Sequence, residues 1–250
     1  MQTTTKLKTE WRVLFQADTP NDVILRSVLD RRCPGLAFAD SASDPTQLLV
    51  RSHGGKAFAS RGVSEAFLDE AVDRAAAIGW TALAETGIPT SVRGRGRAVE
   101  RVRFEDCDLE SDALKGLRDS TPPGFDPQAL DRELLERCHH AKRELPAEYG
   151  ERLDDYFAFG YGVCLLHRAE VVCEAYTGFV AGGRAEAIIG TVTAFRRRGL
   201  AAVAAAYLAE EARRRGHALV WNCHADNAGS IAVARRLAFR TETPYREIYF

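Results

Sequence analysis

The sequence predicts an α/β protein: a smaller α/β domain followed by a mixed, mostly antiparallel sheet with helices on both faces. The chain has 250 residues, of which 46% are apolar and 28% are charged, as is typical of globular proteins. Apolar positions repeat with period two in some segments and with a helical period in others, and glycine-rich turns separate them. A chain of this length can bury a core without disulfides or metals.

The clearest change in composition lies at residues 91–97, where arginine alternates with glycine. Both flanking parts show strand and helix patterns, so we expect a flexible linker here and two domains, 1–97 and 98–250. Glycine-spaced arginines can also bind RNA phosphates, and the basic stretch continues to Arg103. No aromatic side chains interleave with these arginines, which favours the linker.

Charge and cysteine usage exclude several classes of protein. The 34 lysines and arginines against 35 aspartates and glutamates give a net charge of −1, so no overall field attracts a polyanion. The apolar stretch at 200–209 is shorter than the roughly 18 residues of a membrane span, and residues 1–15 lack a signal-peptide core. The six cysteines form no Cys-x-x-Cys pair, and the adjacent His139 and His140 are predicted to lie on the surface. We therefore expect a cytoplasmic protein without a metal or a membrane partner.

The first domain is predicted to contain a helix, a hairpin and a second helix. Helical spacing of apolar residues, with capping residues before and glycine after, predicts the helices. A Gly-Gly turn between two alternating segments predicts the hairpin. These elements cover residues 23–29, 47–51, 56–60 and 64–79. None of them carries recognisable catalytic chemistry, so the role of this domain stays open.

The second domain is predicted to begin with a strand and two helices that Pro146 interrupts. Three strands separated by short turns follow as an antiparallel meander, and then a helix, a strand, a helix and a last strand. The elements cover residues 99–104, 127–156, 161–167, 169–180, 184–195, 199–215, 218–223, 227–237 and 246–250.

One strand-to-helix junction has the features of a phosphate site. Three arginines at 196–198 precede Gly199, and the following helix has no acidic residue in its first turn. Free amide N–H groups, the positive end of the helix dipole and the arginines together attract a diphosphate. Gly199 lets a ligand approach the backbone, and Ala201 and Ala202 leave the amides uncovered. A solvated arginine run is the alternative, and this segment alone does not decide between the two.

Two segments together resemble a known family. Residues 196–201, Arg-Arg-Arg-Gly-Leu-Ala, resemble the cofactor-binding signature (Gln/Arg)-x-x-Gly-x-(Gly/Ala) of the GNAT N-acetyltransferase superfamily. Residues 227–239 resemble its second signature, Asn-x-x-Ser followed by Leu-Gly-Phe, and the two occur in the family's order. The similarity extends over about 99–250, and its details look like a branch that includes zwittermicin-resistance acetyltransferases. Members of that branch also carry an N-terminal extension.

The resemblance implies a GNAT-like fold, acetyl-CoA as the donor and an amine as the acceptor. It places the diphosphate on the amides of the arginine and glycine loop and the pantetheine arm along the strand before that loop. It also implies that Asn227 contacts the pantetheine arm. Arg235 and Arg236 are candidates for the adenosine phosphate. The implied donor residues are Ile189, Gly190, Thr191, Arg196, Arg197, Arg198, Gly199, Leu200, Ala201, Ala202 and Asn227.

An amine acceptor arrives protonated at neutral pH, so a base must remove a proton before attack. Glu186 is the first candidate, because a carboxylate on the strand that leads into the phosphate loop could reach the acceptor. Many GNAT enzymes carry an acid at the end of the next strand, but this chain has Asn222 there, which is no base. His224, two residues on, titrates in the right range and is the second catalytic candidate.

The chain also departs from the family at the general acid. Many GNAT enzymes have a tyrosine seven residues after the asparagine, whereas this chain has Ala234. A thiol leaving group has a pKa near 8.5 and needs little help. Water can then protonate the thiolate, and Tyr176, Tyr245 and Tyr249 are the side-chain candidates for this role. For these three tyrosines, however, packing in the core or at an interface is the favoured interpretation.

We therefore expect an acetyltransferase that acts on a primary amine of a small molecule, with an antibiotic or another amine metabolite as the candidate acceptor. Two alternatives stay open. One is a GNAT-fold transferase that takes its acyl group from aminoacyl-tRNA, and the other is a non-catalytic module that binds acetyl-CoA. A homodimer also stays open.

Overall fold

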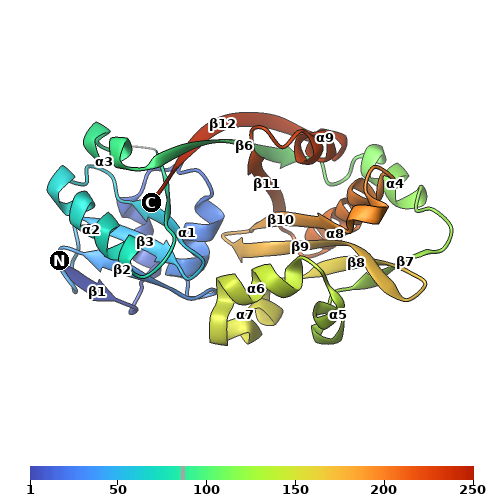
Figure 1. Ribbon diagram of the computed structural model, residues 1–250, viewed down its shortest axis with the longest axis horizontal. Helices are drawn as coiled ribbons and strands as arrows, with labels where there is room; N and C mark the ends of the chain where they lie inside the picture. The colour runs from blue at the N-terminus through green and yellow to red at the C-terminus, as the bar shows by residue number, and fades with distance from the viewer. Residues whose placement is uncertain (86–87) are drawn as a thin grey trace.

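The computed structural model describes residues 1–85 and 88–250, which form two lobes along the long axis of the molecule (Figure 1). The N-terminal lobe is small and mixed. It contains β1 (Gln2–Thr4), η1 (Thr9–Leu14), α1 (Asp22–Leu29), β2 (Gly35–Ala39), β3 (Leu48–Ser52), β4 (Lys56–Ala59), α2 (Glu65–Ala77), β5 (Ala82–Ala84) and α3 (Thr90–Arg95).

The C-terminal lobe carries the remaining elements. Its strands are β6 (Arg97–Cys107), β7 (Phe125–Ala129), β8 (Gly162–His167), β9 (Glu170–Ala181), β10 (Arg184–Thr191), β11 (Ala218–His224) and β12 (Phe239–Tyr249). Its helices are α4 (Asp112–Asp119), α5 (Arg132–Arg137), α6 (Ala141–Tyr149), η2 (Gly150–Arg152), α7 (Leu153–Phe159), η3 (Thr193–Phe195), α8 (Leu200–Arg214) and α9 (Ala228–Arg236).

Within the described residues, one sheet of twelve strands runs through both lobes in the order β1-β2-β3-β4-β5-β12-β6-β11-β10-β9-β8-β7. The strand β12 pairs with β6 along most of its length and also with β5. Figure 1 shows these two long strands crossing from one lobe to the other. The sheet is mixed and mostly antiparallel, as the sequence predicted. Strand β6 begins at residue 97 and belongs to the sheet that both lobes share. The sheet therefore does not separate two domains at this point, and the boundary after residue 97 stays a prediction.

The two lobes repeat one topology. In the N-terminal lobe, β2, β3 and β4 pair antiparallel, α2 follows, and β5 pairs parallel to β4. In the C-terminal lobe, β8, β9 and β10 pair antiparallel, α8 follows, and β11 pairs parallel to β10. The sequence shows no internal repeat, because side chains that fill different cores can build the same backbone path.

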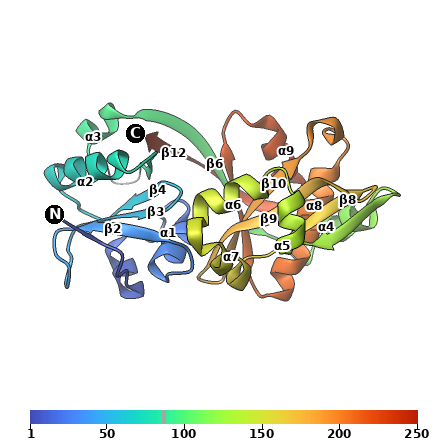
Figure 2. The same cartoon turned by 60° about the horizontal axis from the view of Figure 1, so that its bottom comes forward.

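Helices cover both faces of the sheet in the C-terminal lobe. Cys164 belongs to the core with α5, α6 and α7, whereas the next residue, Leu165, belongs to the core with α8. Neighbouring residues of a strand point to opposite faces, which separates the two cores. Figure 2 shows α5, α6 and α7 in front of the strands.

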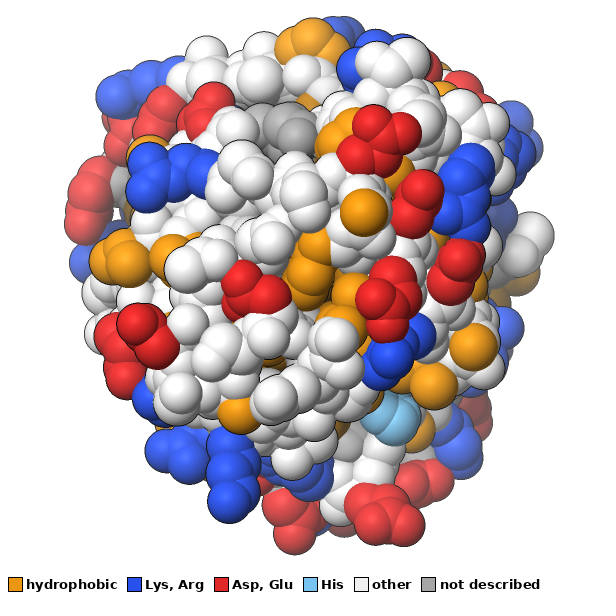
Figure 3. Space-filling view, turned by 90° about the vertical axis from the view of Figure 1, so that its left-hand side faces the viewer, with side chains coloured by type: hydrophobic (Ala, Val, Ile, Leu, Met, Phe, Trp, Pro, Cys, Tyr) orange, Lys and Arg blue, Asp and Glu red, His pale blue; other side chains and the backbone are white. Residues whose placement is uncertain are grey.

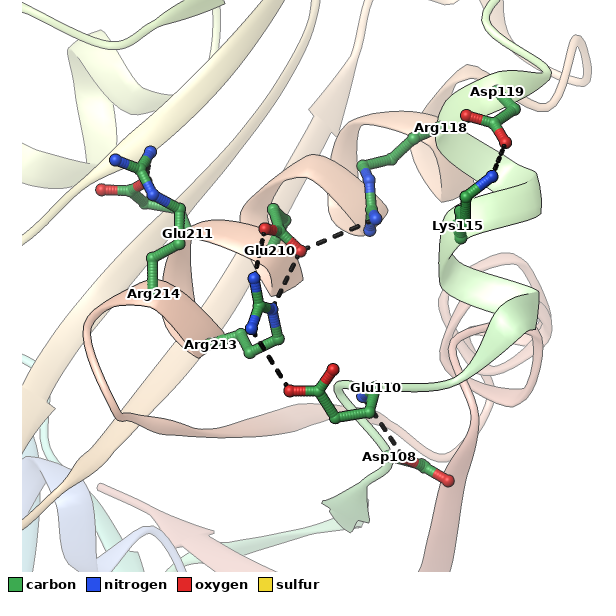
Figure 4. Close-up of polar contacts among 9 residues, drawn as sticks. All are labelled: Asp108, Glu110, Lys115, Arg118, Asp119, Glu210, Glu211, Arg213 and Arg214. Atoms are coloured by element: carbon green, nitrogen blue, oxygen red, sulfur yellow. Dashed lines mark hydrogen bonds and ion pairs between the residues drawn. The ribbon is translucent and has the colours of Figure 1, made fainter.

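Helix α8 is held mainly by its buried face. Leu200, Val203 and Leu208 are almost fully buried in the core beneath it. At its far end, partly exposed ion pairs join it to α4 and to the segment before α4 (Figure 4): Glu210 Oε2 lies 3.6 Å from Arg118 Nη2, and Arg213 Nη1 lies 3.3 Å from Glu110 Oε1. Exposed pairs contribute roughly 0–1 kcal/mol each, against about 1.5–3 kcal/mol for a buried leucine. Apolar packing therefore fixes where α8 begins.

The arginine stretch at 91–97 is not a flexible linker, because it forms most of α3 and the start of β6. Two of its three arginines are paired with carboxylates, and Arg97 lies over the ring of Tyr249. Arg93 Nη1 lies 2.8 Å from Glu85 Oε1, and Arg95 Nη1 lies 2.6 Å from Asp69 Oδ1. On the outer face of the N-terminal lobe, acidic and basic side chains are interspersed (Figure 3).

Four predictions for the C-terminal lobe were wrong. Residues 125–129 form the edge strand β7, where Pro127 is tolerated because its missing N–H faces no further strand. Pro146 lies inside α6 and does not end it, since Leu145 and Tyr149 bury that helix in the core. Strand β10 ends at Thr191 rather than at 195, and β12 begins at Phe239 rather than at 246.

Candidate active site

A cleft of about 1400 Å³ lies between the lobes. The C-terminal lobe lines it with β10, β11, helix α6 and the N-terminal ends of α8 and α9. The N-terminal lobe contributes Gly54, Lys56 and Trp80. The cleft therefore has one wall that belongs to the lobe whose role the sequence left open.

The strands β10 and β11 separate inside this cleft. They pair parallel from Arg184–Ala218 to Ala187–Trp221, and then β10 continues along β9 while β11 continues along β6. The backbone groups of residues 188–191 that face away from β9 have no strand partner among the residues that the structure describes. Such an edge can pair with an extended chain of amides. The predicted residues Ile189, Gly190 and Thr191 all line the cleft here.

The N-terminus of α8 faces the same cleft. Gly199 has φ +81° and only open space where a Cβ would be, so glycine is needed for the turn and leaves room in front of it. In the described part of the chain, α8 has no side-chain cap, no acidic residue in its first turn, and no partner for the amide N–H groups of residues 197–201. Ala202, the last of the donor residues predicted in this loop, differs because its N–H donates to Gly199 O at 3.1 Å.

The corresponding helix of the N-terminal lobe is closed to anions. Ser64 caps α2, accepting from Phe67 N at 3.3 Å, and Glu65 occupies its first turn. A side-chain cap and an acidic residue satisfy the amides and the dipole that α8 leaves open. Of the two repeated helix starts, only that of α8 is suited to a diphosphate.

The three arginines before Gly199 lie in different directions. Arg196 and Arg197 line the cleft, and Arg196 Nε donates to Thr191 O at 3.1 Å. The guanidinium of Arg198 lies over the ring of Phe125, 5.2 Å from its centroid. Arg198 therefore contributes only its backbone amide, and not its side-chain charge, to the loop at the start of α8.

The second signature also reaches the cleft. Asn227 caps α9, with its Oδ1 accepting from Ser230 N at 3.0 Å, and it lines the cleft. Arg236 lines the cleft as well, whereas Arg235 Nη2 donates to Glu242 Oε1 at 3.0 Å. Of the two arginine candidates for the adenosine phosphate, Arg236 is the one that the structure places beside the cleft.

Glu186 lies on the part of β10 that still pairs with β11, opposite a bulge in β9. Its side chain is almost fully buried and lines the cleft, and Asn222 Nδ2 donates to its Oε1 at 3.0 Å. Burial raises the pKa of Glu186 above its ordinary value, although Lys56, Asn222 and Arg101 act against that rise. A carboxylate with a raised pKa is suited to accept a proton near neutral pH.

A polar network lies behind Asn222 and joins the lobes. Tyr245 Oη donates to Asn222 Oδ1 at 3.4 Å and accepts from Asn21 Nδ2 at 2.9 Å. Glu247 is buried and accepts from Lys56 Nζ at 2.7 Å, and Arg101 Nε lies 3.7 Å from the same carboxylate. Residues of both lobes therefore hold the side chain that contacts Glu186.

His224 lies at the end of β11, is exposed and lines the cleft. Partial burial of its ring lowers the pKa of His224, and the nearby charge of Arg101 lowers it further. The ring is therefore neutral at pH 7 and able to accept a proton.

Glu148 on α6 is a cleft residue that sequence analysis missed. Burial raises the pKa of Glu148 to about 7, the Glu186 carboxylate raises it as well, and Lys56 lowers it. Its Oε2 is shut off from solvent and has no hydrogen-bond partner in the part of the chain that the structure describes. No pattern in α6 singled it out, and the one sequence signal was Gly54 in the glycine pair at 54–55, which packs against it. His140, predicted to lie on the surface, also lines the cleft and shares a 2.7 Å hydrogen bond with Tyr176 Oη.

The tyrosines considered as acids lie at different depths. Tyr249 lines the cleft and donates to Glu247 Oε2 at 3.2 Å, whereas Tyr245 lies behind Asn222 and Tyr176 is buried. Burial raises the pKa of all three. Ala234, at the position where the resemblance led us to look for a tyrosine, is fully buried in the core beneath α9.

Ala234→Tyr should therefore destabilise the protein rather than supply an acid. The larger side chain would overpack a closed core, at a cost of about 1–3 kcal/mol. Chemical denaturation should show a lower midpoint, and kcat should not rise. An increase in kcat at unchanged stability would contradict this assignment of Ala234 to the core.

Among residues 1–85 and 88–250, no group of three or more His, Cys, Asp or Glu side chains is arranged to hold a metal ion. No helix in the same residues is long and apolar enough to cross a membrane.

Comparison with known proteins identifies relatives over almost the whole chain. The family model "GNAT acetyltransferase" matches residues 13–248. An uncharacterised N-acetyltransferase of Bacillus subtilis (strain 168), YdfB, is 29% identical over 128 residues, which are 51% of this chain and 49% of that protein. The match thus spans about half the length of this curated relative.

Solved structures share the fold of both lobes. A GCN5-related N-acetyltransferase-like protein from Streptococcus suis superimposes with a TM-score of 0.73 at 21% identity, over 96% of this chain and 97% of that one. A tandem GNAT protein from the clavulanic acid biosynthesis pathway superimposes with a TM-score of 0.61 at 13% identity, over 98% and 92%. The similarity to the tandem protein agrees with the topology that the two lobes repeat.

Proposed function

Because the chain belongs to the GNAT acetyltransferase family and is an acyltransferase, we propose that it transfers the acetyl group of acetyl-CoA to a primary amine on a small molecule. The observation that carries this proposal is the cleft itself. It combines an uncapped helix N-terminus, an unpaired strand edge and a buried carboxylate within one cavity. Each of the three fits one part of the reaction.

The donor side is formed by α8 and β10. The free amides at residues 197–201 and the dipole of α8 bind the diphosphate, with Arg196 and Arg197 adding positive charge. The unpaired edge at 188–191 hydrogen-bonds the amides of the pantetheine arm. The thioester then lies near the point where β10 and β11 separate, beside Glu186.

The acceptor side is formed by Glu186 and its surroundings. Glu186 takes a proton from the acceptor ammonium, and the freed lone pair attacks the thioester carbonyl carbon. A backbone N–H of the unpaired β10 edge at residues 188–191 stabilises the oxyanion that forms. The C–N bond forms and the C–S bond breaks. The second proton of the attacking nitrogen passes through water to the departing thiolate, which leaves an amide and a free thiol.

Acetyl-CoA binding and acetyl transfer test the proposal together. Calorimetry should show saturable binding of acetyl-CoA, and a panel of primary amines should release free thiol from it, detected with a thiol reagent. Binding of acetyl-CoA without thiol release from any amine would contradict transfer to an amine. Strongly salt-dependent binding of aminoacyl-tRNA in place of acetyl-CoA would contradict the donor.

A further inference from the structure

The acceptor side of the cleft holds a second carboxylate that the reaction does not use. Glu148 reaches it from α6, whereas Glu186 reaches it from β10. The two are close enough that the charge of Glu186 raises the pKa of Glu148. A single acceptor ammonium needs one base, so the second carboxylate requires its own explanation.

The N-terminal lobe is shaped around this carboxylate. A Cβ at Gly54 would lie 2.1 Å from Glu148 Oε2, so only glycine leaves space for the carboxylate there. A Cβ at Gly55 would lie 2.5 Å from Cε3 of Trp80, which also lines the cleft. The glycine pair thus lets the hairpin between β3 and β4 pack against two side chains of the acceptor wall.

The charges around Glu148 leave a place for a cation. Lys56 and Arg101 share the buried carboxylate of Glu247. Arg51 also faces Glu148, but its guanidinium donates to the backbone carbonyls of His53 and Trp80. Within the described residues, none of these three cations forms an ion pair with Glu148.

Glu148 Oε2 is shut off from solvent and packs against the backbone of Gly54, which favours the ionised carboxylate. Because Glu148 is half-buried and lines the cleft, a ligand there meets the other carboxylate oxygen. A largely buried carboxylate gains from a donor that a ligand supplies. The charged and titratable groups that interact with Glu148 are Cys33, Arg51, Lys56, Glu144, Tyr149 and Glu186.

We propose that Glu148 binds a second ammonium group of the acceptor, so that the preferred acceptor is a diamine or polyamine rather than a monoamine. This inference rests on the proposed function, since it concerns the acceptor of the same reaction. Glu186 contacts the amine that is acetylated, and Glu148 holds the other one across the cleft. The N-terminal lobe then contributes to specificity through Gly54 and Trp80.

Steady-state kinetics with matched probes test the inference. The wild-type protein should have a higher kcat/KM for 1,4-diaminobutane than for butylamine, which has the same carbon chain. Glu148→Gln should raise KM for the diamine about tenfold or more, as expected for a lost hydrogen bond to a charge, and leave KM for butylamine and acetyl-CoA unchanged. Gly54→Ala should act in the same direction, since it displaces the carboxylate without removing it.

The matched control is Glu151→Gln, which removes the same charge three residues along the chain at an exposed position outside the cleft lining. It should leave the ratio of the two KM values unchanged. Circular dichroism and the melting temperature establish that each variant is folded. A folded Glu148→Gln that raises KM equally for both amines, or for neither, overturns the inference and leaves the proposed function intact.

Proton release provides a readout that needs no turnover. Tetramethyl-1,4-diaminobutane carries two protonated nitrogens and cannot be acetylated stably. A nearby ammonium favours the ionised carboxylate, so its binding at pH 7 should release about half a proton from a group whose pKa is about 7. Calorimetry in two buffers of different ionisation enthalpy measures this release. Glu148→Gln should lower it by the share that belongs to Glu148, and the remainder comes from Glu186, whose pKa is also raised. If the wild-type protein acetylates no amine, the proposed function fails, and an unchanged release in Glu148→Gln separately overturns the inference.

Discussion

Glu186→Gln is expected to lower kcat/KM for every accepted amine by about 10²–10⁴-fold, the usual contribution of a positioned general base. The substitution keeps the size of the side chain, and its amide oxygen can still accept from Asn222 Nδ2, now 3.0 Å from Glu186 Oε1. The change therefore removes the proton acceptor and leaves the surrounding hydrogen bonds in place. KM for acetyl-CoA should stay unchanged, because the donor is held by α8 and the β10 edge.

The pH profile distinguishes loss of a base from loss of structure. In the wild-type protein kcat/KM should fall as the pH drops through the pKa of Glu186, because protonation removes the base. Burial raises that pKa, so this fall should begin above the ordinary glutamate range near 4.3. In the Glu186→Gln variant, the fall of kcat/KM at low pH that belongs to Glu186 should be absent. If the variant keeps wild-type activity and the same profile, the base is another group, with His224 as the next candidate.

Ala201→Glu should change donor binding and stability in opposite directions. Ala201 lies in the first turn of α8 and lines the cleft. An acidic side chain there interacts favourably with the helix dipole, which should raise the free energy of unfolding by about 0.3–1 kcal/mol. The same charge repels the diphosphate, and like charges brought together cost several kcal/mol, so the Kd for acetyl-CoA should rise by about 100-fold.

Ala201→Gln serves as the control, because it adds similar bulk without charge. It should weaken donor binding far less than Ala201→Glu does. Calorimetric titration with acetyl-CoA and chemical denaturation of both variants measure the two effects. Equal weakening by glutamine and glutamate would mean that bulk, not charge, matters here, and unchanged binding in both would remove the diphosphate from this helix.

Local sequence patterns were sufficient to predict a feature when that feature depends on one short segment alone. The arginine and glycine loop, the helix it opens and the asparagine that caps α9 each depend on neighbours in sequence. Prolines misled the analysis, since Pro127 lies on an edge strand and Pro146 lies inside a helix that the core holds. The arginines at 93–95 were taken for a linker because their partners, Glu85 and Asp69, are visible only in the folded chain.

The sequence by itself determined the family signatures, the order of strands and helices after residue 160, and the open start of α8, because periodicity, caps and glycines act over a few residues. Only the tertiary structure decided that Glu148 on α6, Gly54 on the hairpin and Glu186 on β10 share one cleft, and that the two lobes repeat one topology. Those contacts join segments about 40 to 130 residues apart, whose meeting depends on how apolar faces pack rather than on any local pattern.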